Sequence, residues 1–152
     1  MPNPSEEKLD IVSLIQGVIE VFNTDLKTSI TFNSAEKEVF MLADKDQFVR
    51  VFNNLFKNAI QAIPGEREGK IVVDLAVEHG VMKVAIHDNG IGIPKQKHEK
   101  IFVPYFTTKS TGTGLGLAMI KQIIENHKGE IRFESALNLG TTFYIKLPIA
   151  DR

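Results

Sequence analysis

The chain has 152 residues, 43% of them hydrophobic, so it has the size of one domain and enough apolar material for a single core. Its 18 basic and 19 acidic residues are interspersed and give a formal net charge of -1, which leaves no basic stripe of the kind that binds nucleic acid or anionic membranes. The absence of cysteine excludes disulfides and thiolate metal sites, and no apolar run reaches the roughly 18 residues of a membrane span. These features predict a cytoplasmic protein with no nucleic-acid partner and no direct membrane contact in this part of the chain.

The sequence is organised as one domain between short ends. The first residues, MPNPSEEKLD, have no apolar signal region, and we expect residues 1–8 to be a linker. Residues 150–152 are expected to be a tail, which leaves a single domain over 9–149.

Helices and short strands are predicted in the first half of the chain. Residues 9–22 place apolar side chains three and four residues apart, which indicates a helix with one buried face. Short strands are predicted at 29–34 and 38–43, around a turn. Asp44 is a suitable N-cap for a second helix over 45–63, which the following proline and glycine end.

The second half is predicted to contain two pairs of strands with a helix between them. Residues 70–78 and 81–89 are separated by His-Gly and are predicted to form a hairpin. A helix over 114–129 would stop at Gly129 in the C′ position. The last strands are predicted at 130–136 and 141–148. Together these elements predict an α+β two-layer sandwich, with about three helices on one face of a mixed, mostly antiparallel sheet.

The predicted helix over 45–63 carries a polar stripe beside its apolar face. Asn54, Asn58 and Gln61 lie at i, i+4 and i+7 and so share one side of the helix. Asparagine prefers caps and turns, so asparagines within a helix call for a reason. A solvated face is one interpretation, and the other is a carbonyl ligand for Mg²⁺ that is shared with the phosphates of a nucleotide. The apolar face is predicted to consist of Phe48, Val51, Phe52, Leu55 and Ala59.

The strand over 81–89 runs into the stretch DNGIGIP. Gly90 and Gly92 permit close approach of a ligand to the backbone, so Asp88 could face a bound molecule from the strand end. A carboxylate only accepts hydrogen bonds, which fits an exocyclic amine such as that of adenine. A plain turn is the alternative interpretation of these residues.

A glycine-rich stretch precedes the predicted helix over 114–129. Gly112, Gly114 and Gly116 lie where unpaired backbone N–H groups and the positive end of the helix dipole bind anions such as phosphate. Lys109 adds a charge that can reach a phosphate chain. The stretch is predicted to be a movable lid, and a surface loop is the alternative. Its base would be anchored by Phe102, Tyr105 and Phe106.

One known family has motifs similar to five stretches that follow one another along this chain: NNLFKNAIQAI, DNGIGIP, IFVPYFTTK, GTGLGL and LGTTFYIKLP. They are similar to the N box, first glycine box, F box, second glycine box and terminal strand pair of the ATP-binding catalytic domain of sensor histidine kinases. That domain has the Bergerat (GHKL) fold, and FTTK resembles the nitrogen-regulation type. The resemblance covers about residues 9–149.

The resemblance implies a role for each matched residue. Asn58 would be the metal ligand to Mg²⁺, with Asn54 supporting the phosphates, and Asp88 would accept a hydrogen bond from adenine with Thr141 beside it. The implied catalytic residues are Asn54, Asn58 and Lys109. The implied ATP-binding residues are Asn54, Asn58, Asp88, Gly90, Gly92, Ile93, Phe102, Thr108, Lys109, Gly112, Thr113, Gly114, Leu115, Gly116, Leu117 and Thr141.

The same superfamily includes ATPases of the gyrase, heat-shock chaperone and mismatch-repair type. In those proteins a glutamate acts as general base at the position of Asn54, and an amide cannot take a proton from water. The sequence therefore favours phosphoryl transfer to a protein over hydrolysis of ATP. An anti-sigma-factor-type serine kinase is the nearer alternative, and a nucleotide sensor without catalysis is the third.

A sensor kinase also needs an acceptor histidine, which the resemblance assigns to a separate dimerisation domain. His98 precedes Glu99 but leads into the F box, and it is expected to be a solvated side chain. His79, His87 and His127 have ordinary positions at a turn, a strand end and a helix end. The implied partners are ATP or ADP, the histidine-containing dimerisation domain of the same kinase and the receiver domain of a response regulator. A dimer is expected only in the full-length protein.

Overall fold

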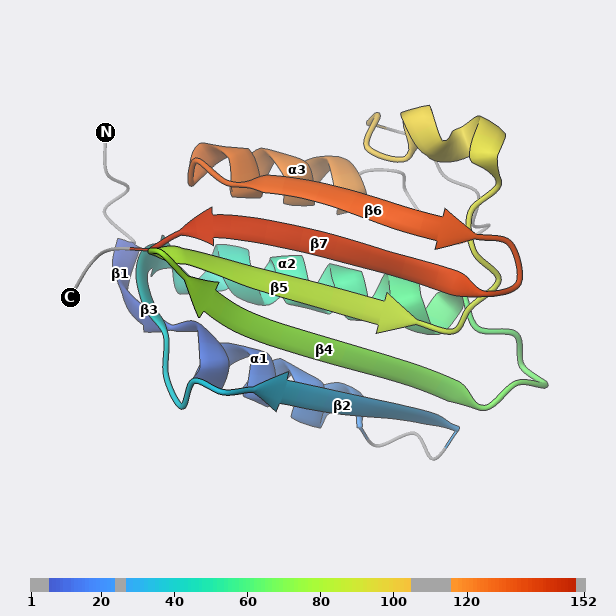
Figure 1. Ribbon diagram of the computed structural model, residues 1–152, viewed down its shortest axis with the longest axis horizontal. Coiled ribbons are helices and arrows are strands. Elements are labelled where there is room, and N and C mark those ends of the chain that lie inside the picture. Colours follow the sequence, from blue (N-terminus) through green and yellow to red (C-terminus); the bar gives the residue numbers. More distant parts are fainter. Residues whose placement is uncertain (1–5, 24–26, 105–115, 150–152) are drawn as a thin grey trace.

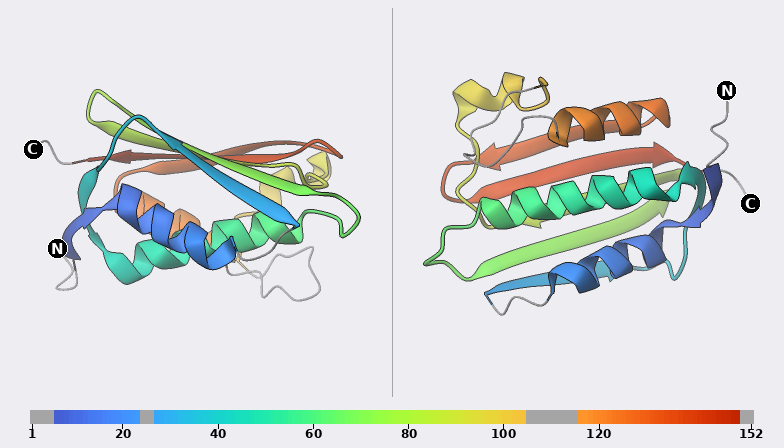
Figure 2. Two further views of the ribbon diagram at one scale, coloured as in Figure 1. Left: turned by 90° about the horizontal axis from the view of Figure 1, so that it is seen from below. Right: turned by 180° about the vertical axis from the view of Figure 1, so that it is seen from behind.

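The computed structural model describes residues 6–23, 27–104 and 116–149. A five-stranded sheet forms one layer. Viewed along the sheet, the α-helices α1 (Ile11–Phe22), α2 (Lys45–Gln61) and α3 (Gly116–Asn126) all lie on one of its faces (Figures 1 and 2). The predicted two-layer sandwich is confirmed, with the core between the helices and the sheet.

The sheet is mixed, with one parallel pair of strands. Its strand order is β2-β4-β5-β7-β6, in which β2 pairs with β4 in parallel and all other pairs are antiparallel. The predicted hairpin of β4 and β5 is confirmed. The bounds are β2 (Thr28–Ser34), β4 (Gly69–Glu78), β5 (Val81–Asp88), β6 (Glu130–Ala136) and β7 (Gly140–Pro148).

A separate two-stranded sheet lies at the end where the chain begins. Its strands are β1 (Glu6–Asp10) and β3 (Phe40–Asp44), paired antiparallel. The expectation of a linker through residue 8 is therefore wrong for residues 6–8, which pair with β3. Asp10 joins the sheet to α1, since its Oδ1 accepts from Val12 N at 3.1 Å and from Val39 N at 3.0 Å.

The second helix has the predicted cap and buried face. The Asp44 side chain accepts from Asp46 N at 2.9 Å, so it is the N-cap of α2. Gln61 is the last helical residue, slightly before the predicted end at residue 63. The predicted apolar residues are all buried, with Phe56 in addition: Phe48, Val51, Phe52, Leu55, Phe56 and Ala59.

The end of α3 differs from the prediction at Gly129. The left-handed residue is Lys128, with φ 64°, so Lys128 and not Gly129 is the C′ residue. Gly129 N donates to Ile124 O at 2.9 Å and Lys128 N to Glu125 O at 2.9 Å, which are the two bonds of a Schellman motif. Glycine is required at 129 because a Cβ there would lie 2.2 Å from Lys146 O in β7.

Two substitutions at this helix end should have opposite effects. We expect Gly129→Ala to lower the free energy of unfolding by about 2 kcal/mol, because its Cβ meets the β7 backbone. Lys128→Gly should raise that free energy by about 0.5 kcal/mol, because it removes a side chain from a left-handed conformation. Urea unfolding of both variants measures these changes, and equal effects of the same sign would contradict this account of the helix end.

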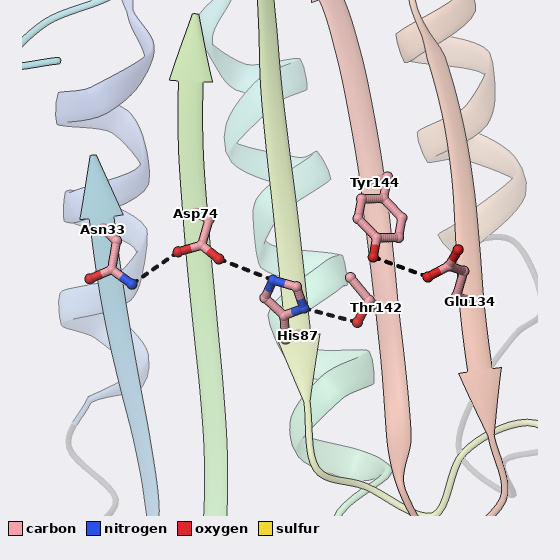
Figure 3. A network of polar contacts seen from close by, with 6 residues as sticks. All are labelled: Asn33, Asp74, His87, Glu134, Thr142 and Tyr144. Atoms are coloured by element: carbon pink, nitrogen blue, oxygen red, sulfur yellow. Dashed lines mark hydrogen bonds and ion pairs between the residues drawn. The ribbon is translucent and has the colours of Figure 1, made fainter. Parts of the chain in front are cut away.

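The open face of the sheet carries its own polar network (Figure 3). Asp74 accepts from Asn33 Nδ2 at 2.9 Å and contacts His87 Nε2 at 3.1 Å, while His87 Nδ1 contacts Thr142 Oγ1 at 2.9 Å. Tyr144 donates to Glu134 at 3.1 Å, and burial, followed by this contact, raises the pKa of Tyr144. These contacts run across the strands, so the network stabilises their pairing.

Candidate functional site

Asp88 is the last residue of β5 and is held by two backbone amides. Its Oδ1 accepts from Gly90 N at 2.8 Å and from Thr141 N at 3.2 Å. The second contact joins the end of β5 to the start of β7, so the expected proximity of Asp88 and Thr141 is confirmed. A carboxylate fixed in this way has a defined orientation at the end of the central strand of the sheet.

The glycines after Asp88 allow the loop to pack closely between other parts of the chain. A Cβ on Gly90 would lie 2.7 Å from Ala62 O, and Ile91 N donates to that same oxygen at 2.8 Å. Gly92 has φ +79° and a Cβ there would lie 2.3 Å from Ala136 O. The loop is therefore fixed between the end of α2 and the turn between β6 and β7, and these contacts explain both glycines without a ligand.

Two further residues hold this loop and were not predicted from the sequence. Arg67 Nη1 donates to Asn89 O at 2.5 Å and to Gly90 O at 3.1 Å. The Asn89 side chain accepts from Lys70 N at 2.8 Å and donates to Glu68 O at 2.9 Å. Asparagine after a strand was a recognisable signal for such backbone contacts, whereas an arginine in a turn carried none.

Removal of the Arg67 guanidinium should loosen the loop. We expect Arg67→Met, which keeps the aliphatic stem, to lower the free energy of unfolding by about 1 kcal/mol, because two carbonyl groups lose a charged donor. Urea unfolding measures the change. Arg132→Met, on the open face beside Tyr144, is the matched control, and we expect a change within about 0.5 kcal/mol. Equal losses in both variants would contradict the role of Arg67.

One residue of the polar stripe of α2, Asn54, lies beside the N-terminal end of α3. Asn54 and Asn58 are half-buried and Gln61 is exposed. Asn54 Nδ2 donates to Arg50 O at 2.9 Å, and a Cβ on Gly116 would lie 3.3 Å from Asn54 Oδ1. A solvated stripe is therefore a poor description of Asn54, whose amide oxygen lies beside the first residue of α3. The first N–H groups of any helix have no partner within the helix, and the helix dipole gives that end a partial positive charge.

The helix α2 connects the two halves of the candidate site. Asn58 lies one turn before Ala62, whose carbonyl holds the loop after Asp88. Asn58 has contacts of its own within the chain. The loop that follows Asp88 is thus held at the C-terminal end of α2, and Asn58 and Asn54 lie one and two turns earlier in the same helix. This arrangement suits an elongated ligand with an amine at one end and anionic groups at the other.

The aromatic part of the site lies over β6 and β7. The Phe102 ring centroid is 6.0 Å from that of Phe133 and 6.4 Å from that of Phe143, so the predicted packing of Phe102 is confirmed. Ile93 is partly buried against the core. His98 lies in the 3₁₀-helix η1 (Lys95–Lys100), contacts Ile93 O through Nε2 at 2.9 Å and meets Phe133 edge-on at 4.9 Å. The expectation of a solvated His98 is wrong.

Part of the predicted site lies outside the described residues. Gly116 and Leu117 are the first residues of α3, and Leu117 packs against the core. The predicted lid, its other aromatic anchors and its lysine belong to 105–115, so those assignments stay predictions. The predicted site residues in that stretch are Thr108, Lys109, Gly112, Thr113, Gly114 and Leu115.

The described residues include neither a cluster of metal-ligating side chains nor a membrane-spanning helix. Among them, no three or more histidine, cysteine, aspartate or glutamate side chains are grouped to hold a metal ion. The half-buried amide oxygens of Asn54 and Asn58 nevertheless fit Mg²⁺ that takes most of its ligands from phosphates and water. In the part of the chain that the structure describes, no helix has the length and apolarity to cross a bilayer.

Comparison with known proteins defines the class. Residues 43–151 match the family of histidine kinase-, DNA gyrase B- and HSP90-like ATPases. The chain belongs to this family, and it is an ATP-binding domain.

The chain has several relatives in that family that are named sensor histidine kinases. It is 35% identical over 146 residues to the sensor histidine kinase ZraS of Escherichia coli strain K12, covering 94% of this chain and 31% of that protein. The catalytic domain of histidine kinase ThkA has a similar structure, with a TM-score of 0.84, 32% identity and 95% of both chains covered. ThkA in complex with the response regulator protein TrrA matches with a TM-score of 0.79 at 28% identity, over 95% of this chain and 42% of that chain. The chain thus spans about a third of the curated relative that it matches.

Proposed function

We propose that the chain is the ATP-binding catalytic domain of a sensor histidine kinase, acting as part of a longer protein. It would transfer the γ-phosphoryl group of ATP to a histidine of a separate dimerisation domain. The observation that carries the proposal is the Asn54 amide beside the first residue of α3, because an amide supplies no base for water there. Similarity to the catalytic domain of ThkA supports the same class of reaction.

Binding of ATP would begin with its adenine base, at Asp88. The amides of Gly90 and Thr141 donate to Asp88 Oδ1 and orient its carboxylate, which would accept from the adenine amine. The loop contacts of Arg67 and Ala62 support this role, because they fix the backbone on which the carboxylate depends. The base would thereby orient the phosphates toward α2 and α3.

The phosphates would lie between the asparagine stripe and the start of α3. Asn58 would hold Mg²⁺ with Asn54 supporting it, and the amides at the α3 N-terminus would bind phosphate oxygens. Bound Mg²⁺ would neutralise charge that develops on the β- and γ-phosphates. Lys109, outside the described residues, would add a second positive charge. The work of the chain is then positioning and electrostatic stabilisation.

In the transfer step, a nitrogen of the acceptor histidine would attack the γ-phosphorus. The bond from that phosphorus to the β,γ-bridging oxygen breaks, and ADP leaves with the electron pair. The acceptor would then pass the phosphoryl group to a response regulator, a partner suggested by the structure of ThkA with TrrA. We place the reaction in the cytoplasm, where ATP is supplied.

Phosphorylation in trans tests this function. The chain would be incubated with γ-labelled ATP, Mg²⁺ and a separately purified dimerisation domain from the longer protein. We expect label on that domain that is stable in base and lost in acid, as for phosphohistidine. Acid-stable label on a protein hydroxyl would indicate a serine kinase, and label released only as inorganic phosphate would indicate an ATPase. Either outcome would overturn the proposal.

A further inference from the structure

Ser135, near the end of β6, contacts two residues predicted to bind ATP, Ile93 and Thr141, and was not itself predicted from the sequence. Its Oγ accepts from Ile93 N at 2.7 Å and lies 2.8 Å from Thr141 Oγ1 and 3.2 Å from Gly140 O. Ile93 ends the loop that begins at Asp88, and the amide of Thr141 binds that carboxylate. Ser135 therefore joins the far end of the loop to the start of β7.

The hydrogen-bonding capacity of a serine hydroxyl determines how these contacts combine. The hydroxyl has one proton and two lone pairs. All three contacts are hydrogen bonds at the same time only if Ser135 donates to Gly140 O and accepts from Ile93 N–H and from the Thr141 hydroxyl. In that arrangement the Thr141 proton is committed to Ser135, so the Thr141 oxygen has only lone pairs for any further partner.

This arrangement has a consequence for the ligand. Asp88 is an acceptor, and Ser135 makes a second acceptor of the hydroxyl of Thr141, a residue that is 4% exposed and whose backbone amide binds Asp88. A site of acceptors favours a base with an amine and disfavours one with a carbonyl oxygen at the same position. We propose that Ser135 is a positioning residue that orients Thr141 and Ile93, and so selects adenine over a 6-oxopurine. This inference rests on the proposed nucleotide site at Asp88.

The test compares ADP with inosine diphosphate, which carries a carbonyl oxygen in place of the adenine amine. Dissociation constants of both would be measured by calorimetry on the 152-residue chain and its variants. Ser135→Val and Ser135→Thr are matched in shape and differ in the hydroxyl, and Ser135→Ala removes the hydroxyl without adding volume. We expect Ser135→Val and Ser135→Ala to bind ADP about tenfold more weakly and to lose about the same factor of preference over inosine diphosphate. Ser135→Thr should keep both the affinity for ADP and the preference for ADP over inosine diphosphate within about twofold of the wild-type values.

Two controls separate positioning from stability. Ile145→Val removes a buried methylene from β7 away from these contacts, and Ser29→Ala removes an exposed hydroxyl from β2 at the other edge of the sheet. Both should keep the wild-type preference for ADP, even where the melting temperature falls. Unchanged preference in folded Ser135→Val would overturn the inference while leaving the nucleotide site intact. Wild-type protein that binds neither nucleotide would instead overturn the proposed function.

If Ser135→Val and Ser135→Ala fail to fold, the inference is tested by amide hydrogen exchange in Ser135→Thr and in the wild-type protein. The exchange of Ile93 N–H, which donates to Ser135, should slow on addition of ADP in both proteins. Exchange at Ile93 that is indifferent to saturating ADP would contradict the inference.

Discussion

Asp88→Asn is expected to weaken ADP binding by at least about 100-fold, which is about 2.7 kcal/mol. The asparagine oxygen can keep the bonds from the amides of Gly90 and Thr141, so the fold should survive. Its NH₂ group would then take the place of the carboxylate oxygen that we propose as the acceptor for the adenine amine. A donor opposes a donor, and a charge-assisted hydrogen bond is lost. Calorimetric titration with ADP measures the change.

Asp74→Asn is the matched control for this substitution. Asp74 is also a carboxylate of the sheet, but its contacts with Asn33 and His87 are on the open face (Figure 3). We expect it to bind ADP with the wild-type affinity. Similar losses of ADP affinity in the two variants, or wild-type affinity in folded Asp88→Asn, would show that the adenine base does not bind at Asp88.

Asn58→Ala is expected to remove the contribution of Mg²⁺ to nucleotide binding. The wild-type chain should bind a non-hydrolysable ATP analogue more tightly with Mg²⁺ than without it, and Asn58→Ala should bind it equally in both conditions. The reason is that the alanine side chain offers no oxygen to the ion. We expect loss of about tenfold in affinity at saturating Mg²⁺, with little change in its absence.

Gln61→Ala serves as the control for the stripe. Gln61 is the exposed last residue of α2 and lies on the same side of the helix as Asn58. Its loss should leave the effect of Mg²⁺ unchanged. An Mg²⁺ effect that persists in Asn58→Ala, or that disappears in Gln61→Ala, contradicts the assignment of Asn58 as the ligand.

Elements with local determinants were predictable from the sequence. The cap of α2 depends on Asp44 and an amide two residues later, and its buried face follows from helical spacing alone. The hairpin of β4 and β5 is joined by His79 and Gly80, both with positive φ, as a type I′ turn requires. The helices, the hairpin and the sandwich could therefore be recognised without tertiary information.

Features that depend on distant contacts were not predictable. Strand β3 pairs with β1 and not with its sequence neighbour β2, which pairs in parallel with β4. Gly129 was assigned to the helix end for its conformation, but it is needed where the chain passes Lys146 O. The choice between Lys128 and Gly129 as the left-handed residue depends on that contact with β7.

The residues of the candidate site also divide into those that the local sequence indicates and those that depend on distant contacts. Asp88 could be proposed from its strand end and glycines, and the stripe of α2 from the spacing of Asn54 and Asn58. Arg67 and Ser135 could not, because they act on backbone groups that are 22 and 42 residues away in the chain. Such partners leave no periodic pattern, so only the folded structure brings them to the loop after Asp88.

The most direct test of the nucleotide site is the change in amide chemical shifts when ADP and Mg²⁺ are added to the labelled chain. We predict the largest changes at the backbone amides of Gly90, Ile93 and Thr141 and at the side-chain amides of Asn54 and Asn58. The Asn33 side-chain amide, on the open face, should not respond. Saturable changes confined to the open face, or no change at millimolar ADP in the folded chain, would contradict the site proposed at Asp88.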